Sequence, residues 1–221
     1  MTEATELNDD GLLRRIMAGD EEAFSLLYKR RHPSLYRFAL HMSGNTSVAE
    51  DVTQEVFLAL IRNPKCFDPA RGTLAGFLFG VARNHLRKRW EQDRRMVSLA
   101  GDPDELTPPS GSGASSKAAL VYPTGNGRTN GNGHNPAPTT YEEFTSIENV
   151  ARVRQAIGTL PENYREVVVL CELEEMSYEE AAAALDCPVG TVRSRLHRAR
   201  AILVEKLRES RTPRRATAVG E

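Results

Sequence analysis

Residues 177–200 read SYEEAAAALDCPVGTVRSRLHRAR, and this stretch decides the fold of the C-terminal part of the chain. Ser177 and Glu180 have the spacing of a capping box, in which each side chain bonds the other residue's backbone N–H at a helix start. The alanines that follow allow two helices to cross closely. Asp186 stands where the chain leaves the first helix, a position that favours left-handed backbone. A short helix, a turn and then a basic helix predict a helix-turn-helix.

The second helix of this motif is the part expected to read DNA. Such a helix enters the major groove, where arginine side chains bind guanine edges or phosphates. An ordinary helical hairpin with a basic face is the alternative, but the coincidence of cap, small residues, turn and arginines favours the DNA-binding motif. The candidate DNA contacts at the start of the motif and on its second helix are Ser177, Thr191, Arg193, Ser194, Arg195 and Arg198.

A segment rich in glycine and proline separates this motif from the first half of the chain. Residues 98–140 hold seven of the 16 glycines and six of the 12 prolines, a composition that buries too little apolar surface to offset its ordering entropy. We therefore predict two small helical domains, at 8–96 and 142–208, joined by a flexible linker over 97–141. A disordered basic tail is expected over 209–221. The fold class is all-α, because neither half shows a strand with convincing alternation of apolar and polar residues.

Helical periodicity also organises the first half of the chain. Asp20 is expected to cap a long helix that Pro33 would kink. Ser47 and Glu50 predict a capping box at the start of the next helix. Thr73 can cap a third long helix. The predicted buried stripes are Phe24, Tyr28, Arg31, Leu35, Phe38 and Met42 on the first of these helices, and Leu74, Phe77, Leu78, Val81 and His85 on the third.

Charge is distributed unevenly in a chain whose formal net charge is only −1. Residues 83–95 and 193–208 each concentrate basic side chains, which indicates two separate contacts with a polyanion, with two solvated helix faces as the alternative. Three widely spaced cysteines form no Cys-x-x-Cys or Cys/His cluster, so we expect no disulfide framework, no zinc site and no cofactor. No signal-peptide pattern and no apolar run of membrane-spanning length is evident. We therefore expect a cytoplasmic protein without membrane insertion.

Two patterned faces in the first half are candidate partner surfaces. Asp51, Gln54 and Glu55 lie at i, i+3 and i+4, on one polar face of a helix. A solvated face is the alternative, and a metal-binding carboxylate pair would lack a third ligand. A second stripe combines cations that hold phosphates with one ring that can stack on an unpaired base, unless the ring merely covers the end of the domain. This stripe consists of Arg83, Arg87, Trp90 and Arg94.

Four segments resemble one known family. The sequence GTVRSRLHRAR at 190–200 resembles the recognition helix of the sigma-70 family, most closely that of its extracytoplasmic-function group. LPENYREV at 160–167 is similar to the helix that precedes it in region 4 of those proteins. AEDVTQEVF at 49–57 and FLFGVARN at 77–84 resemble two segments of their region 2. The departures are Asp186 in place of the usual glycine, and an unusually long linker.

The resemblance implies a sigma factor, a protein with no enzyme activity of its own that binds core RNA polymerase, directs it to promoters and assists promoter melting. It implies that core polymerase contacts Asp51, Gln54, Glu55 and Leu58. It also implies that the loop at 63–72 captures a flipped base of the downstream promoter element, next to DNA contacts from Arg83, Asn84, Arg87, Lys88 and Trp90. The helix-turn-helix would bind the upstream element, and the linker would thread a polymerase channel. An anti-sigma factor is an expected partner, because the family often pairs with one.

Two other functions stay open from the sequence. A helix-turn-helix regulator that acts without joining the polymerase would share the second domain, but it should dimerise on a palindromic site. A nuclease that holds a metal ion on Asp51 and Glu55 is a more remote alternative. Co-purification with core polymerase would discriminate the first, and metal-dependent cleavage of DNA would reveal the second.

Overall fold

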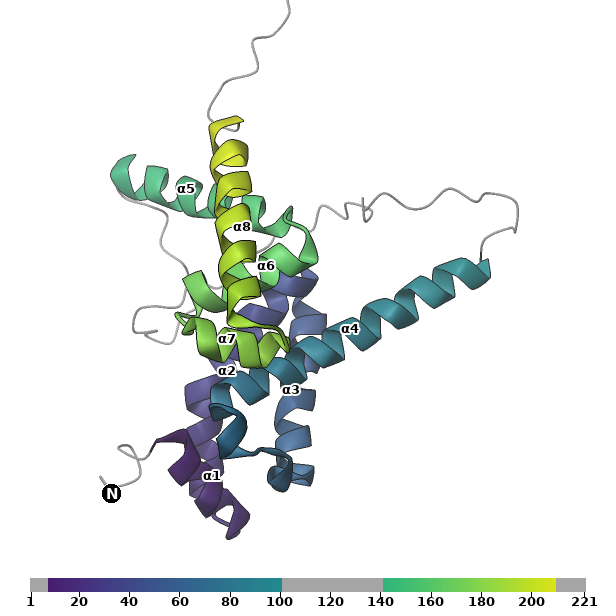
Figure 1. Ribbon diagram of the computed structural model, residues 1–221, viewed down its shortest axis with the longest axis vertical. Helices are drawn as coiled ribbons and strands as arrows, with labels where there is room; N and C mark the ends of the chain where they lie inside the picture. The colour runs from purple at the N-terminus through teal and green to yellow at the C-terminus, as the bar shows by residue number, and fades with distance from the viewer. Residues whose placement is uncertain (1–7, 101–140, 210–221) are drawn as a thin grey trace, which may run out of the picture.

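The computed structural model describes residues 8–100 and 141–209, and every regular element within these ranges is helical. The predicted all-α fold class is therefore confirmed. Most of the predicted linker and nearly all of the predicted basic tail lie outside the described residues. The helices in chain order are α1 Asp9–Met17, α2 Glu21–Ser43, α3 Thr46–Arg62, α4 Leu74–Ala100, α5 Tyr141–Gly158, α6 Glu162–Val168, α7 Tyr178–Leu185 and α8 Val189–Glu209 (Figure 1).

Short polar side chains cap the helices of the first half. The Asp20 carboxylate accepts a hydrogen bond from the Ala23 N–H at 3.0 Å, so the predicted cap of α2 is confirmed. The predicted capping box at Ser47 is wrong. Helix α3 begins two residues earlier than predicted, at Thr46, because the Asn45 side chain accepts from the Val48 N–H at 3.2 Å and leaves Ser47 inside the first turn. Helix α2 runs through Pro33 without interruption.

Helices α1 to α4 enclose the core of the first half. Phe38 of α2 and Phe79 of α4 meet edge to face there, with ring centroids 5.4 Å apart. The predicted stripe on α2 is right for Leu35, Phe38 and Met42, which are buried, but Tyr28 is 39% exposed. The predicted stripe on α4 is only partly right, because Phe77, Val81 and His85 are half-buried. Among residues 74–95 of α4, the buried ones are Leu74, Ala75, Gly76, Leu78, Phe79, Ala82 and Leu86.

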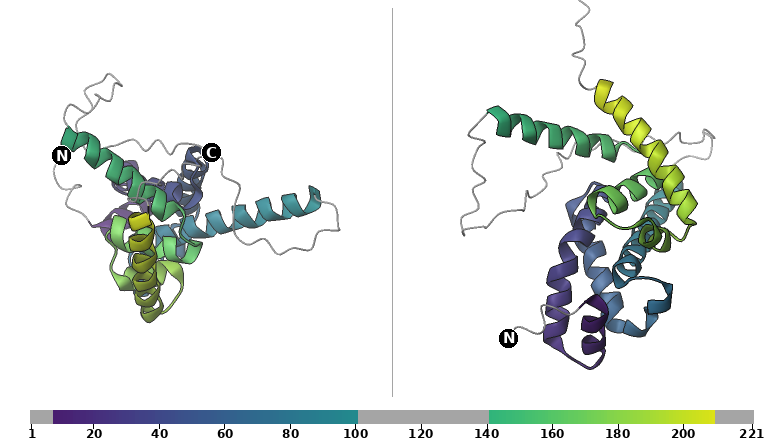
Figure 2. Two further views of the ribbon diagram at one scale, coloured as in Figure 1. Left: turned by 90° about the horizontal axis from the view of Figure 1, so that it is seen from above. Right: turned by 60° about the vertical axis from the view of Figure 1, so that its left-hand side comes forward.

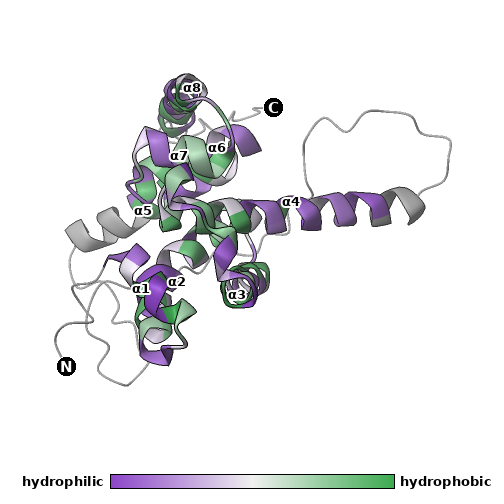
Figure 3. Ribbon diagram, turned by 60° about the horizontal axis from the view of Figure 1, so that its bottom comes forward, coloured by the Kyte–Doolittle hydropathy of each residue, from purple (hydrophilic) through white to green (hydrophobic). Residues whose placement is uncertain are grey.

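Between α3 and α4 the chain makes two short 3-10 turns, η2 Pro64–Cys66 and η3 Pro69–Arg71. They bring the loop back so that it leads directly into α4. The Thr73 hydroxyl oxygen then accepts a hydrogen bond from the Gly76 N–H at 3.2 Å, which confirms Thr73 as the cap of α4. The C-terminal part of α4 projects from the body, and its colour in Figure 3 shows that it is hydrophilic.

The second half builds the predicted helix-turn-helix. Ser177 and Glu180 form both reciprocal bonds of the capping box at the start of α7. Asp186 adopts the left-handed conformation expected of it, with φ of 51°, and turns the chain toward α8. Helix α6 leads into one π-helical turn, η4 Val169–Leu173, which lies beside α7. The helix-turn-helix is therefore confirmed in cap, turn and order.

The two halves pack directly against each other. Helix α7 lies along α4, and α6 contacts α2, so that the buried apolar residues form one continuous cluster from α1 to α8 (Figures 1 and 2). The α4–α7 approach is close because α4 presents glycines: a Cβ on Gly76 would lie 3.4 Å from the Glu180 carbonyl oxygen, and one on Gly80 would lie 3.4 Å from that of Ala184. The sequence predicted two tethered domains and gave no sign of this contact.

Candidate nucleic-acid interface

A polar hollow of about 440 Å³ lies where the 63–72 loop meets α4. Residues of the loop form one wall, including Cys66, Phe67 and Arg71. The α4 side chains that line it are Phe77, Val81, Arg83, Asn84 and Arg87, and Ala183, Ala184 and Asp186 of the second half line it as well. Two of its lining residues form an aromatic pair, with the Phe67 and Phe77 rings 5.8 Å apart. The hollow thus combines apolar rings, an amide and guanidinium groups, which is the chemistry that holds an unpaired base and its phosphates.

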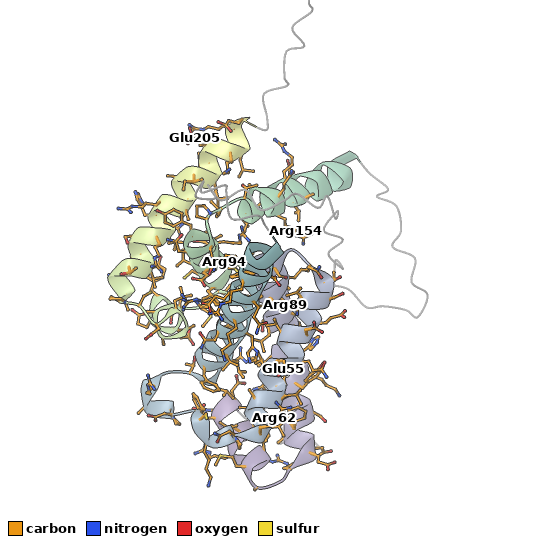
Figure 4. All side chains as sticks on the ribbon, turned by 90° about the vertical axis from the view of Figure 1, so that its right-hand side faces the viewer. Glu55, Arg62, Arg89, Arg94, Arg154 and Glu205 are labelled. Carbon is orange, nitrogen blue, oxygen red and sulfur yellow. The ribbon has the colours of Figure 1, made fainter. Side chains whose placement is uncertain are left out.

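The predicted downstream-element residues divide by exposure along α4. Asn84, Arg87 and Lys88 are exposed to solvent, whereas Arg83 and Trp90 are half-buried. The Trp90 ring packs against the apolar core and also lines a second hollow of about 350 Å³. The packing of Trp90 on the core agrees with the structural alternative, while its role in stacking on a base stays a prediction. Other residues lining this second hollow, the cleft between the halves, are Arg87, Arg94, Glu162 and Arg195. Figure 4 labels Arg89 and Arg94, which follow one another along α4 toward its projecting end.

Arg83 is held by the second half of the chain. Its Nε donates to the Glu166 carboxylate at 2.6 Å, and its Nη1 donates to the Leu185 carbonyl oxygen at 3.1 Å. The Glu166 side chain is 2% exposed. Burial raises the pKa of Glu166, while the neighbouring Arg83 acts in the opposite direction. A 2.6 Å bond to a guanidinium is the geometry of a charge-assisted pair.

The helix-turn-helix presents most of its predicted contacts on one side of α8. Arg193, Ser194 and Arg198 are exposed, and the Arg193 guanidinium lies 5.7 Å from the centre of the Tyr178 ring. Arg195 is half-buried and faces the cleft between the halves. Thr191 is also half-buried, in the first turn of α8.

Two other polar side chains of this surface, Ser177 and Arg200, already bond to carboxylates of the same domain. Ser177 uses its hydroxyl in the capping box, donating to the Glu180 carboxylate at 2.9 Å. Arg200, which the sequence did not place among the contacts, is paired with Glu172 at 2.5 Å.

The predicted polymerase-binding face lies on α3, away from both hollows. Asp51, Gln54 and Glu55 are exposed and Leu58 is half-buried; Glu55 is labelled in Figure 4. Asp51 pairs with Arg89 of α4 at 3.1 Å, an exposed ion pair. Beside this face runs a groove of about 900 Å³ between α2 and α3, lined mainly by rings and apolar side chains: Phe24, Tyr28, His32, Tyr36, Phe57, Leu58 and Ile61.

Comparison with known proteins agrees with this geometry. The chain matches the model of sigma-70 region 2 over residues 27–96 and that of sigma-70 region 4 over residues 151–203. It is 34% identical to the sigma factor EcfG of Rhodopseudomonas palustris, an "ECF RNA polymerase sigma factor", over 77% of each chain. The chain belongs to the extracytoplasmic-function group of the sigma-70 family. This sigma factor is also 32% identical to the sigma-E factor of Escherichia coli K12, over 91% of its own length and 95% of the relative.

Solved structures share the fold. The sigma factor RpoE of Bartonella quintana, solved with the anti-sigma factor NepR, matches 85% of this sigma factor and 98% of its own chain, with a TM-score of 0.56 and 24% identity. None of the helices in the described ranges is long and apolar enough to cross a membrane.

Sequence reasoning missed several residues around these surfaces. Phe77 and Val81 of this sigma factor were assigned to the core, yet they line the loop hollow. Tyr28 was assigned to the core as well, and it borders the α2–α3 groove with Ile61. Because a half-buried aromatic on a functional face has the same helical spacing as a core residue, periodicity alone could not separate the two.

Proposed function

We propose that this sigma factor binds core RNA polymerase through α3, melts the downstream promoter element on α4 and the 63–72 loop, and reads the upstream element with α8. The observation that carries the proposal is the loop hollow. Asn84 and Arg87 share it with Phe67 and Phe77, so that groups suited to a phosphate and groups suited to a base face one space. Neither the loop nor α4 alone could offer this combination.

Duplex opening requires a base to leave its stack. Extrusion costs a few kcal/mol, which base stacking and phosphate contacts must offset. In our proposal the rings of Phe67 and Phe77 in the hollow receive the base. Arg83, Asn84, Arg87 and Lys88 hold the adjacent single-strand backbone, and Trp90 extends this surface along α4. No chemical step by the chain itself is required, since cleavage and synthesis belong to the polymerase.

Upstream recognition uses the exposed side of α8. The exposed positions of Arg193, Ser194 and Arg198 support direct contact with the major groove. Arg195 would join them once the cleft between the halves opens. In this proposal Thr191 and Ser177, near the start of the two helices, would contact the phosphate backbone, although Ser177 also caps α7.

Polymerase docking is assigned to Asp51, Gln54, Glu55 and Leu58, together with the adjoining α2–α3 groove. The exposure of all three polar side chains supports this role, because none is needed for the core. An acidic patch next to an apolar groove fits an interface with a hydrophobic centre and a polar rim. We further propose that the protein acts in the cytoplasm and that an anti-sigma factor regulates it.

Binding to core RNA polymerase separates this proposal from the alternative, a DNA-binding regulator that never joins the polymerase. Purified protein should co-elute with core RNA polymerase at equal stoichiometry and bind promoter DNA specifically only in that complex. A free homodimer that protects a palindromic site without polymerase would overturn the proposal in favour of the alternative.

A further inference from the structure

Tyr178 is the first residue of α7, and its ring lies beside the helix proposed to read the upstream element. The capping box of Ser177 and Glu180 fixes the start of α7, and the half-buried Tyr178 side chain packs against the apolar core. The Arg193 guanidinium of α8 lies over this ring, 5.7 Å from its centre. That distance is within the range of a cation–π interaction. The ring therefore offers a fixed surface to the long side chain of an exposed arginine.

An aromatic ring holds a guanidinium group without using its hydrogen bonds. The ring attracts the charge of the group, and the five N–H donors of an arginine stay available in the plane of the guanidinium. Arg200, about two helical turns further along α8, shows the contrasting case, because the Glu172 carboxylate accepts from its Nε at 3.0 Å and from its Nη2 at 2.5 Å. The contact with Tyr178 thus leaves the donors of Arg193 available for a base edge, whereas the pair with Glu172 occupies two donors of Arg200.

Reading a base requires an arginine to keep one geometry. A guanine is bound by two N–H groups that lie in the plane of the base, so a small rotation of the guanidinium loses one of the two bonds. An unrestrained arginine pays an entropic cost to adopt that geometry, and it can turn to a neighbouring acceptor when the wrong base is present. A ring that restrains the guanidinium before DNA binds lowers the cost for the matching base and removes the escape for the others. Restraint therefore increases discrimination between bases.

We propose that Tyr178 is a positioning residue for upstream promoter recognition: its ring restrains the Arg193 guanidinium, and this restraint sets the discrimination at the base pair that Arg193 reads. The inference rests on the proposed function of α8, and it assigns Arg193 to a base edge in place of a phosphate. Tyr178 acts through Arg193 and not through a contact of its own with DNA. The ring is the part of Tyr178 that matters, so its hydroxyl is dispensable for this role.

Four substitutions separate the ring from the hydroxyl and from general packing. Tyr178→Leu removes the ring but keeps an apolar side chain, and Tyr178→Phe keeps the ring. Tyr164→Leu makes the same change at a half-buried tyrosine of α6 that also packs against the core, and it serves as the control. Arg193→Ala, alone and combined with Y178L, completes a double-mutant cycle. Holoenzyme made from core polymerase and each full-length variant is titrated with duplex fragments of one promoter that the wild-type holoenzyme transcribes, and with fragments that carry single base-pair changes in its upstream element.

We expect R193A to lose discrimination at one base pair of the element. Y178L should reduce discrimination at that same base pair by about two- to fivefold, the range of an exposed cation–π contact, and it should add nothing to R193A. Y178F and Y164L should discriminate as wild type does.

Three other results would overturn part of this account. If R193A relaxes one position while Y178L has no effect there, or has an effect that adds to that of R193A, the positioning role is wrong and the placement of α8 stands. If R193A weakens all fragments alike, Arg193 holds a phosphate and the role of Tyr178 in specificity is wrong. If R193A changes nothing, the assignment of Arg193 to the upstream element is itself wrong.

The NMR signal of the Arg193 side chain reports the restraint without any DNA. In the free full-length protein, the ring current of Tyr178 should shift the Nε–Hε resonance of Arg193, which is assigned by its absence from the spectrum of R193A. The shift should persist in Y178F and Y164L and disappear in Y178L. The dispersion of the amide resonances in the same spectra shows whether each variant is folded, and Tyr178→Met, with a flexible side chain that fills irregular space, replaces Y178L if that variant is not. An Arg193 resonance at the same position with and without the ring would overturn the proposal.

Discussion

Individual residues on α4 and α8 have different neighbours, and these decide what each substitution should do. Arg83 bonds the second domain, whereas Asn84 and Arg87 are exposed beside the loop hollow. Arg200 of α8 is paired with Glu172, while Arg193 and Arg198 are exposed on the same helix with no carboxylate bonded to them in the described part of the chain. The exposed members of each set are therefore the cleaner probes of DNA binding.

Asn84→Ala and Arg87→Ala should reduce transcription from double-stranded promoters more than from templates already unpaired at the downstream element. An unpaired template spares the few kcal/mol that base extrusion requires, so weaker contacts matter less there. Run-off transcription on the two templates measures the difference. Arg62→Ala, an exposed arginine at the end of α3, should affect neither template. Equal losses on both templates would remove α4 from duplex opening.

Arg193→Ala and Arg198→Ala should weaken upstream binding in one of two distinguishable ways. An arginine that reads a base contributes about 1–3 kcal/mol, and its loss relaxes specificity at one position. An arginine that holds a phosphate weakens all sequences alike and lowers the salt slope by about one. Holoenzyme binding to promoter variants across salt concentrations separates the two. Arg200→Ala, which removes an arginine already paired with Glu172, is the matched control; an equal effect from R200A would argue against this placement of α8.

His41 should make the folded state sensitive to acid. Burial, with the nearby Arg154, Arg37 and Arg165, lowers the pKa of His41 from 6.5 to about 4. Because the unfolded chain takes up this proton near pH 6.5 and the folded chain does not, the free energy of unfolding is unaffected above that pH. It then falls as the pH drops toward 4, by at most about 3 kcal/mol.

Denaturant unfolding of wild type and His41→Gln across pH 4–7 tests this effect. The raised pKa values of Glu166 and Glu174 act with the opposite sign, since those groups favour folding while protonated and lose that contribution as the pH rises. The difference between wild type and variant isolates the histidine. Parallel stability curves for the two proteins would show that His41 is not the group responsible.

At the scale of single elements, local sequence signals were sufficient where a cap or turn is made by neighbours in the chain. The capping box at Ser177 and the left-handed turn at Asp186 are examples. The same signal was misleading at Ser47, because Asn45 two residues earlier supplies the cap instead. A pattern of residue types cannot rank two competing caps whose bonds both close within one turn.

Alanine substitutions at Ser177, Asn45 and Ser47 should show which of the three side chains caps a helix. Ser177→Ala removes a hydroxyl that accepts the Glu180 N–H, and Asn45→Ala removes the cap of α3. Each should lower the free energy of unfolding by about 1 kcal/mol. Ser47→Ala is the matched control and should change it by a few tenths at most, as for other surface positions. A comparable loss at Ser47 in urea unfolding would contradict the placement of the α3 cap.

The candidate site was less predictable than the helices that build it. The basic stripe on α4 and the arginines of α8 could be found from spacing and charge. The loop hollow could not, because it arises only when residues of the 63–72 loop are brought against Phe77 and Val81. Periodicity placed those two residues in the core, since α4 is packed on one side by the first domain and on another by α7, and a single stripe cannot describe both sides.

In the whole molecule, the contact between the two halves joins their buried apolar residues into one cluster. It joins segments about a hundred residues apart, such as Arg83 with Leu185. It also involves Gly76 and Gly80 of α4, and a glycine adds nothing to the apolar periodicity by which a buried helix face is predicted. The face of α3 proposed to bind polymerase lies outside this contact, and its polar side chains Asp51, Gln54 and Glu55 are exposed.

The central claim is that this chain gives promoter specificity to core RNA polymerase through the α3 face. Its most direct test is run-off transcription on fragmented genomic DNA, with core polymerase and either wild-type protein or Asp51→Lys plus Glu55→Lys. Wild type should create a defined set of new transcripts. The double variant should abolish them without a large loss of thermal stability, since both carboxylates are exposed and the Asp51–Arg89 pair contributes at most about 1 kcal/mol. Transcripts identical to those of core polymerase alone, or unchanged in the double variant, would contradict the account.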